Sequence, residues 1–280
     1  MEWLTDRAML QRWRRQVQGQ LAFVPTMGAL HEGHLRLLRA ARESPGRVIA
    51  SIFVNPTQFA PNEDFARYPR TLEQDRLLLQ EAGCDAVFVP SVAEMYHGSG
   101  QTRVQVEPLG SDLCGRFRPT HFQGVATVVT ILLNLVRPDR LYLGCKDYQQ
   151  LILLRQMVAD LALPVQVLGV ETVREADGLA MSSRNRYLAP EERARAVGVA
   201  QALAAAQQAR RAGERRVEVL QAVAQAVLAR HGIEQVDYVA VRDAATLAAL
   251  PEGVIGDQDP VMLLAVRVGT TRLIDNRILA

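Results

Sequence analysis

The sequence contains almost no lysine. Only one of its 32 Lys and Arg residues is a lysine, Lys146, and the others are arginine. Arginine presents a planar fork of donors, whereas the lysine ammonium is a compact point charge on a flexible stem. The count therefore marks Lys146 as a candidate functional cation, although an accident of composition explains it equally well.

Cysteine is also scarce, and its spacing excludes two kinds of site. The three cysteines, Cys84, Cys114 and Cys145, are an odd number, lie far apart and form no C-x-x-C pair. Neither a disulfide framework nor a thiolate zinc site is indicated. A reducing compartment is the simplest interpretation, so we expect a cytoplasmic protein.

Long apolar runs and a strong charge bias are absent as well. No uncharged apolar run reaches the roughly 18 residues that a membrane span needs, and the N-terminus lacks the apolar core of a secretory signal. The formal net charge is +2, with arginines spread along the chain, whereas nucleic-acid binders collect basic residues on one face. Hydrophobic residues make up 49% of the 280 residues, which excludes disorder as the main state.

Up to residue 170, short apolar runs alternate with segments of helical character. The pattern predicts strands at 21–24, 47–54, 85–90, 140–144 and 165–170, and a shorter one at 104–106; helices are expected at 7–18, 31–43, 71–83, 125–136 and 148–161. Nearly continuous apolar strands separated by helices are typical of a parallel sheet covered on both faces. The predicted fold is α/β, a Rossmann-like doubly wound parallel sheet, and ligands of such sheets bind beyond the carboxyl ends of the strands.

The pattern changes after residue 170. Two Ala-rich helical segments are followed by the strands VDYVAVRD and PVMLLAVRVGTTRLIDN, which no helix separates in the βαβ manner. This predicts a second, smaller α+β domain, with the domains at 1–172 and 173–280.

The motif PTMGALHEGH (25–34) follows the first of these strands and opens a helix. Helix N-termini attract anions, and Gly28 and Gly33 allow a ligand to approach the backbone. His31 and His34 share one helix face and can donate to phosphate oxygens. The alternatives are two surface histidines or a zinc pair, but the histidines are three apart and not four as in HExxH.

Three more segments carry polar groups. The amides of Asn55 and Gln58 can orient a carboxylate or hydroxyl, although an Asn-Pro pair is more often only a turn. Lys146 opens a helix, where an anion would relieve its unfavourable place in the helix dipole; nothing marks a base that would make Cys145 a nucleophile. The segment 181–185 (MSSRN) is either a polyphosphate-binding segment or a solvated linker. Together they favour phosphate chemistry by positioning and charge stabilisation.

Six collinear blocks carry a family resemblance: PTMGALHEGH, SIFVNPTQF, YPRT, RPTHFQGV, GCKDYQQ and DGLAMSSRNRYL. They cover about residues 20–190 and resemble the pantothenate synthetase (pantoate–β-alanine ligase) family of the HIGH-motif nucleotidyltransferase superfamily. The C-terminal strands also fit.

The resemblance implies an ATP-dependent ligase with two steps. Pantoate would attack the α-phosphate of ATP to give pantoyl adenylate and pyrophosphate, and β-alanine would then give pantothenate and AMP. It further implies Mg²⁺ bound mainly through the phosphates, a homodimer, no nucleic-acid or membrane partner, and a small second domain that acts as a lid.

The same resemblance assigns roles to individual residues. Those implied in catalysis are His31, His34, Lys146, Ser182, Ser183 and Arg184. Those implied to bind ATP are Met27, Gly28, Ala29, Leu30, His31, Glu32, Gly33, His34, Gly144, Cys145, Lys146, Asp147, Val173, Met181, Ser182, Ser183 and Arg184. Gln58 and Gln150 would hold pantoate, with Asn55 and Arg118 as weaker candidates, and Asp75 would be an outer partner of the metal.

One position departs from the family pattern. The family usually has GEKD where this chain has Gly144-Cys145-Lys146-Asp147, which puts in doubt any role of the missing carboxylate. A nucleotidyltransferase that transfers AMP to a phosphate acceptor is the nearest alternative, and it predicts an acceptor pocket rich in arginine or lysine. A catalytically idle nucleotide-binding protein is the other. A tRNA synthetase is disfavoured because the remaining hundred or so residues leave no room for an anticodon-binding domain.

Overall fold

The chain folds into two compact units. The structure, a computed structural model, describes residues 1–61, 63–96 and 100–280. The first unit comprises Met1–Cys145 and Leu153–Glu171, and the second comprises Lys146–Ile152 and Thr172–Ala280. The division after Glu171 lies next to the predicted boundary, whereas the placement of Lys146–Ile152 with the second unit was not predicted. No helix of the described residues has both the length and the apolar character needed to cross a membrane.

The first unit is built on a six-stranded sheet in which every neighbouring pair is parallel. Its order across the sheet is β1 (Glu2–Leu4), β4 (Ala86–Phe88), β3 (Arg47–Ile52), β2 (Leu21–Thr26), β5 (Arg140–Gly144) and β6 (Gln166–Val170). The predicted doubly wound parallel sheet is confirmed. Strands β3 and β4 lie on one side of β2, whereas β5 and β6 lie on the other. The strand order therefore reverses between β2 and β5, and the ends of these two strands mark the topological switch point.

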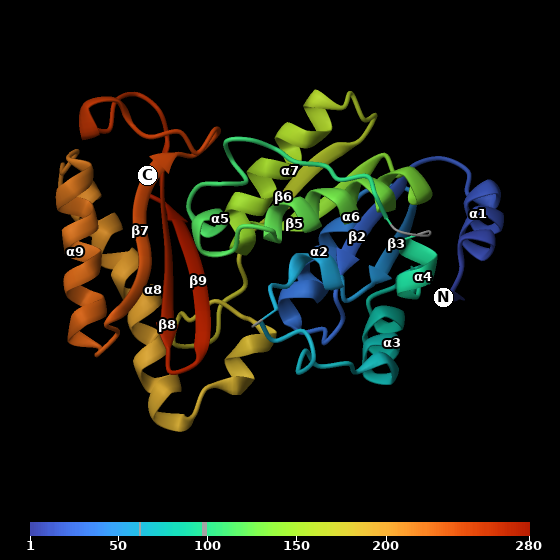
Figure 1. The fold of residues 1–280 in the computed structure, drawn as a ribbon, viewed down its shortest axis with the longest axis horizontal. Coiled ribbons are helices and arrows are strands. Elements are labelled where there is room, and N and C mark those ends of the chain that lie inside the picture. Colours follow the sequence, from blue (N-terminus) through green and yellow to red (C-terminus); the bar gives the residue numbers. More distant parts are fainter. Residues whose placement is uncertain (62, 97–99) are drawn as a thin grey trace. The chain divides into compact units, whose positions relative to one another are not determined.

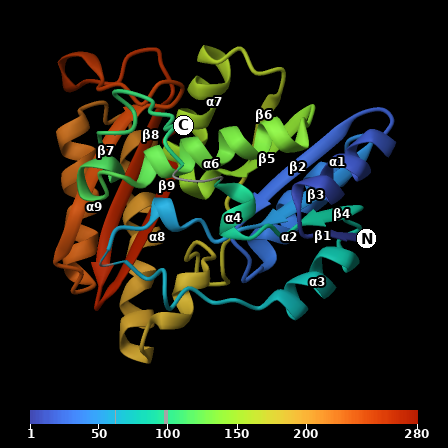
Figure 2. The same ribbon diagram turned by 45° about the vertical axis from the view of Figure 1, so that its right-hand side comes forward.

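Helices cover this sheet on both faces (Figures 1 and 2). They are α1 (Arg7–Gln16), α2 (Glu32–Arg42), α3 (Leu72–Glu81), α6 (His121–Val136) and α7 (Tyr148–Asp160). The short helices α4 (Val92–Met95) and α5 (Cys114–Phe117) lie in the connections between these elements. One set of alternating strand residues, such as Val24 and Ala50, packs with α2 and α3. The opposite set, such as Phe23 and Ile49, is also completely buried. Burial on both faces explains why these strands are apolar throughout.

The structure differs from the predicted elements in several places. The edge strand β1 (Glu2–Leu4) was not predicted. No strand forms at 104–106, because the Val104 N–H donates to Thr127 Oγ1 (3.0 Å) instead of to a ladder. Helix α6 begins at His121, four residues earlier than expected. Strand β2 continues through Pro25, since β5 pairs only with Ala22 and Phe23 and the missing N–H of proline costs no ladder bond.

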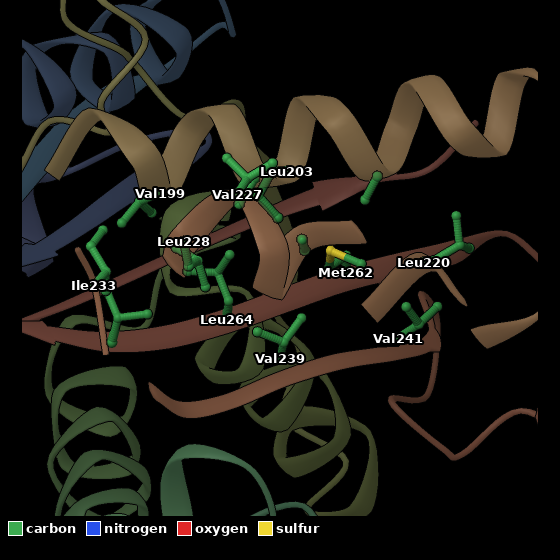
Figure 3. Close-up of a cluster of buried hydrophobic side chains, with 14 of the residues drawn as sticks. Val199, Leu203, Leu220, Val227, Leu228, Ile233, Val239, Val241, Met262 and Leu264 are labelled. Atoms are coloured by element: carbon green, nitrogen blue, oxygen red, sulfur yellow. The ribbon is translucent and has the colours of Figure 1, made fainter. Parts of the chain in front are cut away.

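The second unit is an antiparallel sheet covered by two helices. Strands β7 (Gln235–Asp243), β8 (Pro260–Val268) and β9 (Thr271–Ile278) pair in that order. Helices α8 (Pro190–Arg211) and α9 (Val217–Arg230) supply the other half of a buried cluster (Figure 3). In it Leu203 and Leu228 of the helices meet Met262 and Leu264 of β8. This confirms the predicted smaller α+β part.

Candidate active site

The segment after β2 forms a tight loop that leads into α2. Thr26 starts it: its hydroxyl donates to the Ser51 carbonyl (2.8 Å) and accepts the Gly28 N–H (3.2 Å). Gly28 and Ala29 then adopt left-handed backbone conformations, with φ of +81° and +51°. The N–H groups of Ala29 and Leu30 donate to the two carboxylate oxygens of Asp75, at 3.0 and 2.8 Å.

His31 and His34 form the N-terminal cap of α2. His31 Nδ1 accepts the Gly33 N–H (3.1 Å), and His34 Nδ1 accepts the His31 N–H (3.3 Å). Since an accepting Nδ1 leaves the proton of a neutral imidazole on Nε2, both rings present an Nε2–H donor. The ring centroids are 4.2 Å apart, as expected from the i, i+3 spacing. Among the described residues, no group of three or more His, Cys, Asp and Glu side chains could hold a metal ion.

Gln58 joins the loop after β3 to the loop after β2. It ends the 3₁₀ turn Pro56–Gln58, and its Nε2 donates to Met27 Sδ at 3.0 Å. Its Oε1 accepts from Asn55 Nδ2 (3.1 Å). A thioether is a weak acceptor, so this amide N–H would gain by donating to a carboxylate or hydroxyl oxygen. The Met27 and Gln58 positions predicted from sequence are therefore brought into contact.

Asn55 is buried and hydrogen-bonded to Gln58 and to three other residues. Its side chain is 1% exposed, and its second amide hydrogen goes to the Gly124 carbonyl (3.2 Å). Its Oδ1 accepts from the hydroxyls of Thr57 (2.9 Å) and Tyr96 (2.7 Å). Burial raises the pKa of Tyr96, so this phenol remains a protonated donor. The hydrogen bond to Gln58 Oε1 fixes how the Gln58 amide is oriented, and a contact of Asn55 with pantoate stays a prediction.

Arg118 lies beside Gln58, but its charge is balanced. Its guanidinium donates two hydrogen bonds to the Glu63 carboxylate, at 2.6 and 2.5 Å, and a third to the Gln58 carbonyl (3.3 Å). His121 Nδ1 contacts the same carbonyl at 2.9 Å. Burial works to raise the pKa of Glu63, but the hydrogen bonds and charge of Arg118 outweigh it and lower that pKa below its usual value.

At the end of β5, Gly144 and Cys145 present an accessible backbone and no charged side chain. A side chain at Gly144 would meet nothing within 4 Å, so a ligand can approach its backbone. Cys145 follows, half-buried, and burial raises the pKa of its thiol. A thiol that stays protonated is a poor nucleophile, which agrees with the absence of an indicated base.

Lys146 belongs to the second unit, where its backbone is anchored by β9. The side-chain amide of Asn276 donates to the Lys146 carbonyl at 2.9 Å. Two residues further on, the Tyr148 hydroxyl donates to the Ala244 carbonyl (3.0 Å). Asp147 is exposed, and Gln150 is half-buried near the start of α7.

The MSSRN segment is also built within the second unit. The Met181 N–H donates to the Val173 carbonyl (2.9 Å), and Arg174 and Ala180 form an antiparallel bridge. Ser182 caps the turn Ser183–Tyr187 by accepting the Arg184 N–H (3.3 Å). The segment is therefore an ordered turn and not a featureless linker.

Ion pairs hold the base of this turn. Arg174 makes two bonds to Asp275, at 2.7 and 3.0 Å, and the Asp275 side chain is fully buried. Glu175 accepts from Asn185 Nδ2 and from Arg193, both at 2.6 Å. Asp275 of β9 thus binds Arg174 at the base of the turn, and Asn276 binds the backbone carbonyl of Lys146.

The predicted site residues fall into separate sets. Within the first unit, the structure brings Met27 to Gln58 and the loop before His31 to Asp75. Within the second, Val173 meets Met181, and Lys146 meets Asn276. Glu32 pairs with Arg39 on the outer face of α2. A common cavity for His34, Lys146 and Ser182 stays a prediction.

Sequence reasoning missed several residues that form hydrogen bonds with the candidate site residues or with their neighbours. They are Thr57, Glu63, Tyr96, His121, Gly124, Asp275 and Asn276. His121 and Gly124 lie inside the block RPTHFQGV, which carries the resemblance only as a whole. Asp275 and Asn276 lie within β9, whose sequence pattern indicates a strand and nothing more. Tyr96 stands in a stretch without periodicity, so no local pattern could have found it.

Comparison with known proteins decides the family. The chain matches the model of the pantoate-beta-alanine ligase family over residues 3–278. The chain belongs to this family. Pantoate–β-alanine ligases join pantoate and β-alanine, as the name of the family states, and the match runs through nearly all of this chain.

Individual relatives agree with the assignment to the pantoate–β-alanine ligases. The pantothenate synthetase of Magnetococcus marinus is 54% identical, over 100% of this chain and 96% of its own length. The crystal structure of pantothenate synthetase from Thermus thermophilus superposes with a TM-score of 0.93 at 47% identity, covering 100% and 99% of the two chains. The ligase of Francisella tularensis, solved in complex with beta-gamma ATP and beta-alanine, gives a TM-score of 0.81 at 32% identity, covering 100% and 98%.

Proposed function

We propose that this chain ligates pantoate and β-alanine in two steps through pantoyl adenylate, with ATP as the activating substrate. The observation that carries the proposal is the 3.0 Å contact between Gln58 Nε2 and Met27 Sδ. It joins the candidate acid-binding amide to the loop that precedes the His31–His34 cap. An acid and a nucleotide held by these two loops would meet at the carboxyl edge of the sheet, where open α/β sheets bind ligands.

Pantoate is proposed to replace the sulfur of Met27 as the acceptor for Gln58. A carboxylate or hydroxyl oxygen accepts more strongly than a thioether. The Asn55 network holds the amide in one orientation before substrate arrives, which reduces the cost of ordering it on binding. Gln150 is proposed as the second amide, and Arg118 as a weaker contact whose charge Glu63 already balances.

Activation of the acid requires charge stabilisation. A pantoate oxygen forms a bond to the α-phosphorus of ATP, the bond to the β-phosphate breaks, and pyrophosphate leaves with the electron pair. The N-terminus of α2 and the Nε2–H donors of His31 and His34 are proposed to stabilise this charge. Lys146, Ser182, Ser183 and Arg184 are proposed to bind phosphate oxygens, while the backbone at Gly28, Gly144 and Val173 contacts the nucleotide.

In the second step the amine of β-alanine attacks the acyl carbon of the adenylate. The carbon–nitrogen bond forms, the bond to the phosphate oxygen breaks, AMP leaves, and the amine gives up a proton. The adenylate is a mixed anhydride that water would hydrolyse, so excluding water protects it. We propose that the smaller second unit acts as the lid that does so.

Mg²⁺ is proposed to enter as part of the ATP substrate. The described residues contain no cluster of three acidic, histidine or cysteine side chains for a metal, and the Asp75 oxygens already accept three hydrogen bonds. Among the described residues no all-protein Mg²⁺ cage is indicated, and Mg²⁺ commonly binds through phosphates and water. A cytoplasmic homodimer is proposed as the working form; cysteines that form no disulfide suit a reducing compartment.

Isotope exchange between pyrophosphate and ATP tests the proposal. Exchange that requires pantoate and proceeds without β-alanine is the expected result, because the first step is reversible alone. Exchange that ignores pantoate would favour a nucleotidyltransferase, and nucleotide binding without pyrophosphate release under any acid would favour an idle binding protein.

A further inference from the structure

Asp75 is a buried carboxylate whose described hydrogen-bond donors are all neutral. It stands in the first turn of α3 and is 1% exposed. Oδ2 accepts the Ala29 N–H (3.0 Å), and Oδ1 accepts the Leu30 N–H (2.8 Å) and the Thr71 hydroxyl (3.1 Å). Within the described part of the chain no Lys, Arg or His side chain forms an ion pair with it. Because a buried charge is unfavourable unless hydrogen-bonded, these three donors must compensate it.

The two amides lie in a turn whose backbone conformation is unfavourable for a residue with a side chain. Gly28 and Ala29 have positive φ in succession, and a residue with a Cβ, such as Ala29, seldom adopts this region. Consecutive N–H groups in such a turn converge and form a small anion-binding concavity. In this chain the anion is the side chain of Asp75, supplied from 45 and 46 residues away along the sequence.

Gly28 and Asp75 are matched sterically as well. A Cβ at Gly28 would lie 2.9 Å from Asp75 Oδ2 and 3.0 Å from Ile52 Cγ2. The carboxylate therefore reaches the loop only because residue 28 has no side chain. The loop then continues directly into His31, the N-cap of α2.

We propose that Asp75 is a positioning residue for adenylation: it holds the Gly28–Leu30 turn so that His31 and His34 face the phosphates before ATP binds. This inference rests on the proposed function, in which those histidines act on ATP. It also gives the carboxylate a role other than that of an outer metal partner.

The variant Asp75→Asn keeps the shape but replaces one accepting oxygen by a donating NH₂ group, so one loop amide loses its partner. We expect kcat for pantoate-dependent adenylation to fall about 10- to 100-fold, the effect of misplacing catalytic groups by a fraction of an ångström to an ångström. KM for pantoate and the half-saturating Mg²⁺ concentration should be unchanged. Thr71→Val, which removes only the third bond to the same carboxylate, is the matched control and should stay close to the wild-type kcat.

Two results in the variant would overturn the proposal. Unchanged kcat with a lowered Tm would make Asp75 merely structural. Recovery of activity at high Mg²⁺ would make it a metal partner instead.

A measurement on the unmodified enzyme keeps the proposal testable if Asp75→Asn does not fold. Amide hydrogen exchange followed by NMR should show Ala29 and Leu30 protected in the ligand-free protein, since both amides are bonded before ATP arrives. Exchange at the rate of an open loop would refute preorganisation. This readout does not involve turnover, so it separates failure of the Asp75 proposal from failure of the proposed function, which would appear as missing pantoate-dependent exchange in the wild type.

Discussion

The side-chain amide of Asn276, near the C-terminus of the chain, donates a hydrogen bond of 2.9 Å to the backbone carbonyl of Lys146. Asn276 is 7% exposed and lies on β9 beside Asp275, which pairs with Arg174. The only lysine of the chain thus has its backbone fixed by a residue 130 positions away. Besides pairing with β8, the C-terminal sequence LIDN therefore holds the backbone of a candidate site residue.

Asn276→Ala should slow adenylation by about tenfold, since a misplaced charged group loses part of its stabilisation of the transition state. Asn134→Ala is the matched control, because Asn134 also donates from Nδ2 to a backbone carbonyl at 2.9 Å, but on the exposed face of α6. Steady-state pyrophosphate exchange compares the two. Equal rates in both variants would show that the anchor does not matter for catalysis.

Lys146→Ala should reduce adenylate formation by about 100-fold or more, the effect of removing one preorganised group that stabilises developing charge. Folding should be little affected, since the Asn276 contact is to the backbone and survives the substitution. Lys146→Arg should also be impaired because a planar fork replaces a point charge. Rapid-quench detection of the adenylate, with a thermal melt alongside, gives both readouts; normal turnover by Lys146→Ala would remove the lysine from the mechanism.

Gln58→Ala should lower kcat/KM for pantoate about 10- to 100-fold, because a hydrogen bond to a charged group contributes about 1.5–3 kcal/mol. The Kd for ATP, measured by calorimetry without pantoate, should stay the same. Gln80→Ala on the exposed face of α3 is the control substitution. If ATP binding falls as much as pantoate use, Gln58 is not the acid-binding amide.

Glu63→Gln tests the ion pair beside Gln58. Arg118 lowers the pKa of Glu63 in the folded protein, against burial, which raises it. A carboxyl whose folded pKa is depressed contributes stability above its unfolded pKa, and the contribution is lost as the pH falls through the folded value. The difference in free energy of unfolding between wild type and variant should therefore be constant above the ordinary value of 4.5 and shrink below it. Urea titrations across this range measure it, and a difference that grows on acidification would contradict the assignment.

Much of the fold could be predicted because its signals are local. The apolar runs predicted as strands at 21–24 and 47–54 lie in β2 and β3, whose residues Phe23, Val24, Ile49 and Ala50 are buried on both faces, so an apolar run was enough to indicate strands of a covered parallel sheet. The exception at 104–106 shows the limit of this argument. Its alternation resembles a strand, but Thr127 takes the N–H of Val104, and no property of the segment itself reveals that partner.

The order of residues along the chain was by itself enough to determine the parallel sheet, the smaller α+β part, the histidine pair at a helix start and the family. Each of these depends on neighbours in sequence, through periodicity, spacing and contiguous motifs. Only the tertiary structure decided that Asp75 holds the loop before His31, that Asn276 holds Lys146, and that Glu63 neutralises Arg118. These contacts join residues 45 to 130 positions apart, and the geometry that makes one distant carboxylate or amide the partner exists only once the strands and helices have packed.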